Sequence, residues 1–120
     1  MDGVVSDSLN RGALAAFEDI DDGGFVAVEA VVDGEAESLI LHRQGGEIRA
    51  WLNICPHAGR RLDWAPGKFL KSTDGLLVCA VHGASFELGR GECVAGPCRG
   101  EVLRAVAVEL RDGKVLMADG

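Results

Sequence analysis

Two short motifs combine cysteine and histidine at spacings that suit metal binding. They are Cys55-Pro56-His57 and, after 21 intervening residues, Cys79-Ala80-Val81-His82. Thiolates are soft ligands and imidazoles are borderline ones, so a set of two cysteines and two histidines suits either zinc or an iron–sulfur cluster. Each motif follows a predicted strand, which allows a loop on a rigid base to present both ligands.

The spacing within the motifs favours two metal ions over one. Zinc sites usually pair cysteine with cysteine and histidine with histidine, whereas each motif here pairs a cysteine with a histidine. Because one residue separates Cys55 from His57, both side chains are hard to place on a single tetrahedral ion. A Rieske [2Fe–2S] centre, in which two histidines replace two cysteines on one iron, has the matching ligand set. A zinc-stapled binding module stays open as an alternative.

On these motifs the chain resembles the Rieske [2Fe–2S] proteins, and among them the soluble Rieske-type ferredoxins. The resemblance extends from about Phe25 to Met117. It is densest in CPHAGRRLDW (Cys55–Trp64), CAVHGASF (Cys79–Phe86) and the pair Gly96-Pro97.

The resemblance implies one [2Fe–2S] cluster per chain. Cys55 and Cys79 would hold the buried iron, and His57 and His82 would hold the outer iron. A third loop, which contains proline, covers the cluster in this family, and Gly96-Pro97 resembles it. Exposed imidazoles place the transferred electron near the surface, so the resemblance implies an electron carrier.

Departures from the high-potential members of the family indicate a low reduction potential. Those members have an additional cysteine in each ligand loop, joined as a disulfide, where this chain has Arg60 and Val81. They also have a serine and a tyrosine that donate hydrogen bonds to sulfur, where this chain has Ala84 and Phe86. Such donors stabilise the reduced state. The chain contains no tyrosine at all, so we expect a low-potential centre.

The segments around the motifs predict an all-β fold. Three runs rich in branched and aromatic residues are separated by Asp33-Gly34 and Gly45-Gly46, which favour tight hairpin turns. We therefore predict an antiparallel meander. The expected strands are Phe25–Val32, Ser38–Arg43, Glu47–Asn53, short pieces at Leu76–Cys79 and Ser85–Leu88, and, on either side of Asp112-Gly113, Val102–Leu110 and Lys114–Ala118.

Together with the resemblance, this pattern predicts a Rieske-type antiparallel β-sandwich with an inserted loop-rich subdomain. Residues 1–120 are expected to form a single domain. The cluster-binding subdomain would span about 54–99, and residues 1–22 would form an N-terminal arm. In that arm the spacing of Leu14, Phe17 and Ile20 suits one helical turn or a tucked-in segment.

Composition excludes several classes of partner. The 120 residues have a net charge of −7, which argues against nucleic-acid binding. The longest apolar run, Leu76–Val81, is far shorter than the ~20 residues that span a bilayer, and the acidic stretch Met1–Asn10 leads us to expect no secretion signal. We expect a cytoplasmic protein with no membrane partner, in which cysteines are metal ligands or free thiols.

Several residues are expected to lie outside the ligand set. His42 is interpreted as a structural histidine, and Trp51 and Trp64 as packing groups. Cys93 and Cys98 are interpreted as free thiols near the cluster, with a local disulfide or a redox-sensitive pair as the alternative. A basic docking rim for an acidic partner is a further possibility, formed by Arg60, Arg61, Lys68, Lys71, Arg90 and Arg99.

The leading hypothesis is therefore an electron carrier between a reductase and an oxygenase or similar oxidoreductase. Its partners would be these redox proteins. The alternative is a non-catalytic Rieske subunit of a larger enzyme, such as a nitrite-reductase-type small subunit. A Rieske oxygenase also needs a mononuclear iron site with two histidines and a carboxylate. Only His42 remains for such a site, so we expect no catalysis by the chain alone.

Overall fold

The computed structural model describes residues 13–56, 59, 61–80 and 83–118. This part of the chain contains strands, one 3-10 helix and no α-helix. No helix in it is long and apolar enough to cross a membrane. The elements are β1 (Ala13–Ala16), η1 (Phe17–Asp19), β2 (Phe25–Val32), β3 (Glu35–Gln44), β4 (Glu47–Leu52), β5 (Leu70–Lys71), β6 (Leu77–Val78), β7 (Ser85–Phe86), β8 (Cys93–Ala95), β9 (Val108–Arg111) and β10 (Lys114–Met117).

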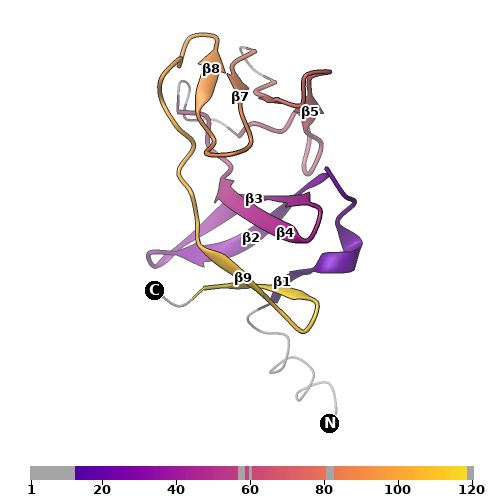
Figure 1. The fold of residues 1–120 in the computed structure, drawn as a ribbon. Coiled ribbons are helices and arrows are strands. Elements are labelled where there is room, and N and C mark those ends of the chain that lie inside the picture. Colours follow the sequence, from indigo (N-terminus) through magenta and orange to yellow (C-terminus); the bar gives the residue numbers. More distant parts are fainter. Residues whose placement is uncertain (1–12, 57–58, 60, 81–82, 119–120) are drawn as a thin grey trace.

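The strands form three antiparallel sheets that follow one another along the molecule (Figure 1). The small sheet β5-β6-β7-β8 lies at the top of Figure 1, the sheet β2-β3-β4 in the middle and the sheet β1-β10-β9 at the bottom. The predicted all-β class is confirmed. The short strands of the upper sheet lie within the loop-rich range of about 54–99 that the sequence predicted, which also contains both cysteine motifs.

The middle sheet is the predicted meander. Strands β2 and β3 pair from Phe25 opposite His42 to Val32 opposite Glu35. The turn between them has φ values of 53° at Asp33 and 86° at Gly34, and two left-handed residues are what a two-residue type I′ hairpin requires. Strand β3 is longer than predicted because pairing with β2 continues to this turn.

The lower sheet contains a strand that the sequence did not indicate. Strand β1 pairs antiparallel with β10, and the 3-10 helix η1 follows it directly, so that Leu14 lies on a strand and Phe17 in the short helix. Ile20 is 1% exposed and anchors the end of this segment in the core. Alanine-rich β1 has a weak intrinsic preference for strand, so its conformation depends on the edge that β10 offers.

The predicted strand Val102–Leu110 is regular only from Val108, where β9 begins. Upstream of it the extended chain changes partners: the Leu103 N–H donates to Gly91 O, while Arg104 O and Ala50 O accept from Leu52 N–H and Val106 N–H. This segment runs along the left side of Figure 1 from β8 to β9. It therefore ties the upper sheet to β4 without forming a continuous ladder.

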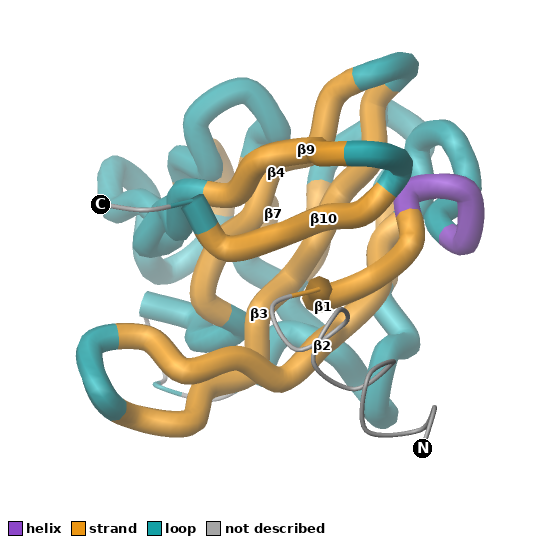
Figure 2. Tube along the Cα trace, turned by 90° about the horizontal axis from the view of Figure 1, so that it is seen from below, coloured by secondary structure: helices purple, strands orange, loops and turns teal. Residues whose placement is uncertain are grey.

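The middle sheet has a hydrophobic core on both faces. Ile40 and Trp51 belong to the core cluster shared with the upper sheet. Leu41 and Ala50, their neighbours in sequence, belong to the cluster shared with the lower sheet, which lies nearest the viewer in Figure 2. Successive side chains of a strand point to opposite faces, so the continuous apolar run in β3 reflects burial on both sides.

Replacing Ile40 by alanine should destabilise the fold strongly, because the side chain is completely buried in the cluster that the middle sheet shares with the upper sheet. We expect the free energy of unfolding to fall by about 2–5 kcal/mol, measured by urea denaturation with tryptophan fluorescence. Val31→Ala on β2 is the control, since Val31 is 66% exposed; it should change stability by about 0.5 kcal/mol or less. Similar losses in the two variants would contradict this assignment of the core.

Candidate metal centre

Cys55 and Cys79 each begin a turn of the same construction. The Gly59 N–H donates to Cys55 O at 2.8 Å, and the Gly83 N–H donates to Cys79 O at 2.9 Å. Both glycines have positive φ, 67° and 75°, a conformation that costs other residues about 1–2 kcal/mol. Glycine thus stands four residues after each cysteine for a physical reason. The sequence analysis missed this shared signal, although both glycines are visible in the motifs.

The two cysteine side chains are buried in one core. Cys55 lies just after β4 and is 0% exposed, and Cys79 lies just after β6 and is 1% exposed. Both belong to the upper hydrophobic cluster. The expected ligands His57 and His82, and the positions Arg60 and Val81, lie outside the described residues.

Backbone hydrogen bonds join the two turns to each other. The Ala80 N–H donates to Leu62 O at 3.2 Å, across from the second turn to the segment that follows the first. The Cys79 N–H donates to Ala84 O at 2.7 Å and closes the second turn at its base. The two cysteine-bearing turns are therefore held as one unit although 23 residues separate Cys55 from Cys79 in sequence.

The loop at Gly96-Pro97 packs directly on the second turn. Gly96 has a φ of 97°, and a Cβ atom at this position would come within 2.8 Å of the Ala84 Cα. No larger residue fits there without displacing backbone. Ala84 is itself fully buried, as is Phe86. The proline loop thus adjoins the turn that it was expected to cover.

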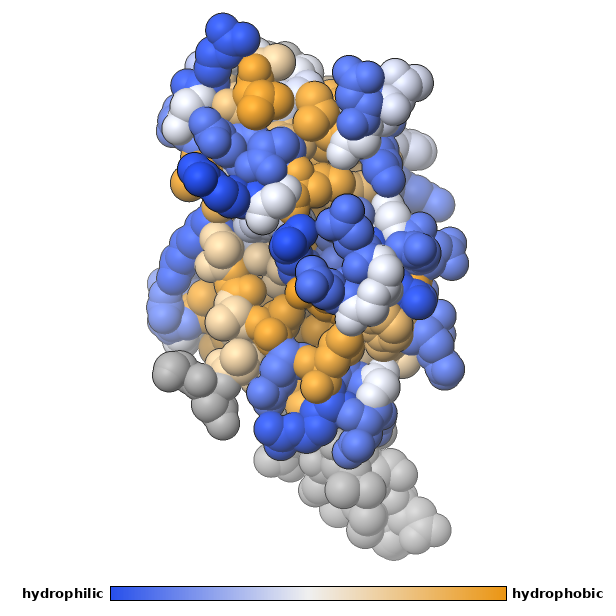
Figure 3. Space-filling view, viewed as in Figure 1, coloured by the Kyte–Doolittle hydropathy of each residue, from blue (hydrophilic) through white to orange (hydrophobic). Residues whose placement is uncertain are grey.

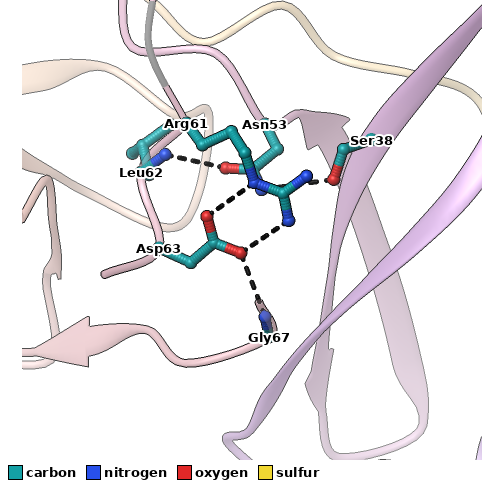
Figure 4. Close-up of polar contacts among 6 residues, drawn as sticks. All are labelled: Ser38, Asn53, Arg61, Leu62, Asp63 and Gly67. Carbon is teal, nitrogen blue, oxygen red and sulfur yellow. Dashed lines mark hydrogen bonds and ion pairs between the residues drawn. The ribbon is translucent and has the colours of Figure 1, made fainter. Parts of the chain in front are cut away.

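A buried asparagine fastens the segment after the first turn. Asn53, which is 1% exposed, accepts a hydrogen bond from the Leu62 N–H through Oδ1 at 2.9 Å and donates through Nδ2 to Ser38 Oγ at 3.2 Å (Figure 4). One side chain therefore connects β3, the end of β4 and the chain beyond the first turn. A buried amide satisfied in this way fixes the geometry of its neighbours.

Asp63 also stabilises the segment after the first turn through side-chain hydrogen bonds. Its side chain is 1% exposed and accepts hydrogen bonds from Arg61 Nε at 2.9 Å, Arg61 Nη2 at 2.8 Å and the Gly67 N–H at 3.0 Å (Figure 4). Burial opposes ionisation of the carboxyl group, but the hydrogen bonds from Arg61, Gly67 and Asn53 outweigh it and lower the pKa of Asp63. The carboxylate is thus ionised and fully paired at neutral pH.

The residues described in the two turns fit an iron–sulfur centre. Two thiols in apolar surroundings suit a metal that is shielded from water, and thiolates are the protein ligands of such clusters. All four cysteines lie in the described part of the chain, and no disulfide joins any of them. Cys55 and Cys79 thus place two buried thiols on two turns that the backbone holds together.

His42 is a structural residue, as predicted. It is 2% exposed, donates from Nδ1 to Gly24 O at 3.0 Å and stacks on Phe25 with ring centroids 4.5 Å apart. Burial is the main cause that lowers the pKa of His42, so the ring is neutral at pH 7. It therefore has a role in packing the upper face of the middle sheet.

The prediction for the two tryptophans is confirmed for Trp51 and wrong for Trp64. Trp51 is 2% exposed and lies in the upper cluster, whereas Trp64 is 60% exposed. The inward positions next to it are taken by Leu62 and Asp63, and a turn closed by the Trp64 N–H on Lys68 O directs the chain outward. Trp64 is thus a surface aromatic in the segment that follows the first cysteine-bearing turn.

Most of the predicted basic rim is engaged in local contacts. Arg61 binds Asp63, as described above. Three other bases contact the protein: Lys71 donates to Gly23 O, Arg90 pairs with Glu92, and Arg99 donates to Val94 O. Lys68 is exposed, and Arg60 lies outside the described residues. The face in Figure 3 accordingly shows hydrophilic and apolar areas interspersed over the upper and lower sheets.

Comparison with known proteins identifies a family model and similar structures. The model of the Rieske [2Fe-2S] domain matches residues 10–109. The ferredoxin of carbazole 1,9a-dioxygenase from Nocardioides aromaticivorans IC177 is 25% identical, with a TM-score of 0.68 over 90% of this chain and 96% of that one. A chain in a complex of reduced oxygenase and oxidized ferredoxin of carbazole 1,9a-dioxygenase is 24% identical, with a TM-score of 0.66 over 88% of this chain and 90% of that one.

Curated relatives match over a shorter range. Biphenyl 2,3-dioxygenase subunit alpha of Rhodococcus jostii (strain RHA1) is 36% identical over 64 residues, which are 53% of this chain. The chain spans 13% and 10% of the lengths of the curated relatives that it matches. The similarity to these longer proteins is therefore confined to one domain.

Replacing Asp63 by asparagine should weaken the segment that follows the first cysteine-bearing turn. We expect the free energy of unfolding at pH 7 to fall by about 1–3 kcal/mol, the usual cost of losing hydrogen bonds to a buried charged group. Because the folded-state pKa of Asp63 lies below its unfolded value, the stabilisation is present above about pH 4 and is lost as the pH falls through the folded pKa. The gap between wild type and variant should therefore narrow below pH 4 in urea denaturation.

Glu109→Gln is the matched control for this prediction. Glu109 also pairs with an arginine two residues away, Arg111, at 3.1 Å, but this pair is exposed. The control should lose about 0.5 kcal/mol or less. Equal losses in both variants, or a gap that does not change with pH, would refute the role assigned to Asp63.

Proposed function

The chain belongs to the Rieske [2Fe–2S] domain family, and we propose that it is an electron carrier between a reductase and an oxygenase or similar oxidoreductase. Its cofactor is a [2Fe–2S] cluster. The observation that carries the proposal is the similarity to a dioxygenase ferredoxin over 96% of that ferredoxin's length. The fold of this chain therefore matches almost the full length of a protein that is itself named as a ferredoxin.

Cys55, Cys79, His57 and His82 are proposed as the cluster ligands. The burial of both cysteines in the same core and the glycine-closed turns that follow them support this assignment. When bound, the cluster supplies a site that takes up and releases one electron. The chain's own residues contribute burial of the sulfur ligands, a fixed spacing of the two turns through Leu62 and Ala80, and exclusion of water by the proline loop on Ala84.

A low reduction potential follows from the same surroundings. Alanine at position 84 and phenylalanine at position 86 have no side-chain group that donates a hydrogen bond to sulfur. Such donors stabilise the reduced, more negative state. The proposed carrier therefore works near the lower end of the Rieske range, at about −150 mV, and differs in this from a respiratory-chain subunit.

The proposal also covers the location of the protein, its domain extent, its lack of catalysis on its own and its partners. We place the protein in the cytoplasm and treat residues 1–120 as one domain, with a cluster-binding subdomain at about 54–99. The chain does not catalyse a reaction alone, because the single histidine outside the ligand set, His42, is occupied in packing. Its partners are redox proteins.

A non-catalytic subunit of a larger oxidoreductase is the second candidate. The observation in its favour is that the matched domain forms only 13% and 10% of the curated relatives, so the same fold also serves inside larger enzymes. Purification in a fixed ratio with a catalytic subunit would favour this candidate. A zinc-stapled binding module, the remaining alternative of the sequence analysis, conflicts with the family match.

Substitution of the proposed histidine ligands should abolish the cluster's spectroscopic signature. His57→Ala and His82→Ala should each lose the visible absorbance and the EPR signal of the dithionite-reduced protein, and should lose most of the iron and sulfide expected for one [2Fe–2S] cluster. His42→Asn is the control: its side-chain amide can still donate to Gly24 O, so iron and signal should be kept. An intact signal in either alanine variant would refute the ligand assignment.

Restoring hydrogen-bond donors near the sulfur ligands should raise the reduction potential. Ala84→Ser and Phe86→Tyr, together or singly, are expected to shift the midpoint upward from about −150 mV, measured by redox titration with visible or circular dichroism detection. Phe17→Tyr, on the short helix beside the lower sheet, adds the same hydroxyl far from the upper cluster and should leave the midpoint unchanged. A strongly positive midpoint in the wild type would contradict the low-potential assignment.

A further inference from the structure

Cys93 and Cys98 form a buried pair that the proposed electron-transfer site does not use. Each side chain is 1% exposed. The Cys98 thiol donates to Cys93 Sγ across 2.7 Å, and the Cys93 thiol donates to Ala95 O across 3.2 Å. The two sulfur atoms are therefore direct neighbours, with no other side chain between them.

The backbone holds the pair in this position. Strand β8 begins at Cys93, whose N–H donates to Glu101 O at 2.7 Å and whose carbonyl accepts from the Gly100 N–H at 3.0 Å. The Glu101 N–H in turn donates to Cys98 O at 2.9 Å. The two cysteines thus stand at the base of a short loop that is closed by backbone pairing, so no large movement is needed to bring the sulfurs together.

The loop between the two cysteines is the proline loop. Residues 94–97 are all exposed, whereas the cysteines at both ends are buried. Gly96 at its tip packs on Ala84, as described above, and Cys93 and Cys98 belong to the same buried cluster as Cys55. The pair therefore lies beneath a loop that contacts one proposed ligand turn, in the same core as the cysteine of the other.

We propose that Cys93 and Cys98 are an oxidisable dithiol, which a hydroperoxide converts to an intramolecular disulfide that fastens the base of the proline loop. One thiol attacks the peroxide O–O bond and becomes a sulfenic acid, with release of one water from hydrogen peroxide. The second thiol displaces the sulfenic hydroxyl, so that the S–S bond forms and a second water leaves. Two thiols lose two electrons in total, and one hydrogen peroxide takes them up.

The surroundings of the pair favour disulfide formation over other fates of the thiols. Each side chain is 1% exposed, so bulky alkylating or disulfide reagents are kept away from the two sulfur atoms. Hydrogen peroxide is much smaller than such reagents, and the loop between the two cysteines is exposed. A sulfenic acid formed there has the second thiol in contact, which removes it before further oxidation.

Tryptic mapping tests the proposal directly, because Cys93 and Cys98 share one peptide while Cys55 and Cys79 fall in two others. Cleavage after the arginines and lysines places Cys93 and Cys98 together in residues 91–99, Cys55 in residues 50–60 and Cys79 in residues 72–90. Reduced holoprotein is treated with hydrogen peroxide, denatured in acid with a chelator and N-ethylmaleimide, digested and weighed. The test does not depend on the proposed electron-transfer role.

The expected result is a change confined to residues 91–99. That peptide should pass from two maleimide labels to none, with a mass two hydrogens below the unlabelled dithiol. Cys93→Ser and Cys98→Ser, which have one thiol in this peptide, should never show that mass. A peptide that keeps both labels under peroxide, one that ends as sulfonic acids, or a cross-link between residues 91–99 and 50–60 would each overturn the proposal.

A second measurement tests whether the disulfide stabilises the protein. Oxidation should raise the apparent melting midpoint of the wild type by about 4 °C or more, since a cross-link restricts the unfolded chain. The double variant Cys93→Ser/Cys98→Ser, treated in the same way, should show no rise. An unchanged midpoint in the oxidised wild type, or an equal rise in the double variant, would contradict a disulfide that stabilises this loop.

Discussion

The structure depends on holding two short turns together in one apolar core. Cys55 follows a strand of the middle sheet and Cys79 follows a strand of the upper sheet, yet both thiols are buried in the same cluster. Each turn is closed by a hydrogen bond from a glycine four residues on, and the Ala80–Leu62 bond links the two. A metal centre with ligands from both turns needs this fixed spacing, because a cluster ties together whatever elements supply its ligands.

The rest of the fold can be understood as support for these turns. The middle sheet is buried on both faces, which makes it a rigid base for the chain that leaves β4 toward Cys55. Asn53 and Asp63 then fasten the stretch beyond the first turn through side-chain hydrogen bonds, where no regular sheet is present. On the other side, Gly96 and the Cys93–Cys98 pair hold the proline loop against the second turn. Side-chain hydrogen bonds and close glycine contacts thus stabilise this region, whereas backbone hydrogen bonds between strands stabilise the middle and lower sheets.

The sequence predicted the parts of the fold that local chemistry determines. The Asp33-Gly34 and Asp112-Gly113 hairpins, the meander and the cysteine motifs follow from turn residues and spacing that any short window shows. Strand β1 could not be predicted in this way, because Ala13–Ala16 become a strand only through pairing with β10. The segment before Val108 looked like a strand but splits its hydrogen bonds among several partners. The exposure of Trp64 and the burial of Asn53 and Asp63 depend on how the segments pack in three dimensions, which one sequence does not reveal.

The central claim is that one cluster is held by two cysteines and two histidines. Pulsed EPR of the dithionite-reduced holoprotein, prepared with ¹⁵N-labelled histidine, tests it most directly because it detects nitrogen bound to iron. The account predicts hyperfine couplings from two ligating histidine nitrogens, and the same two couplings in the His42→Asn variant. A reduced cluster without any coupled histidine nitrogen would contradict the account.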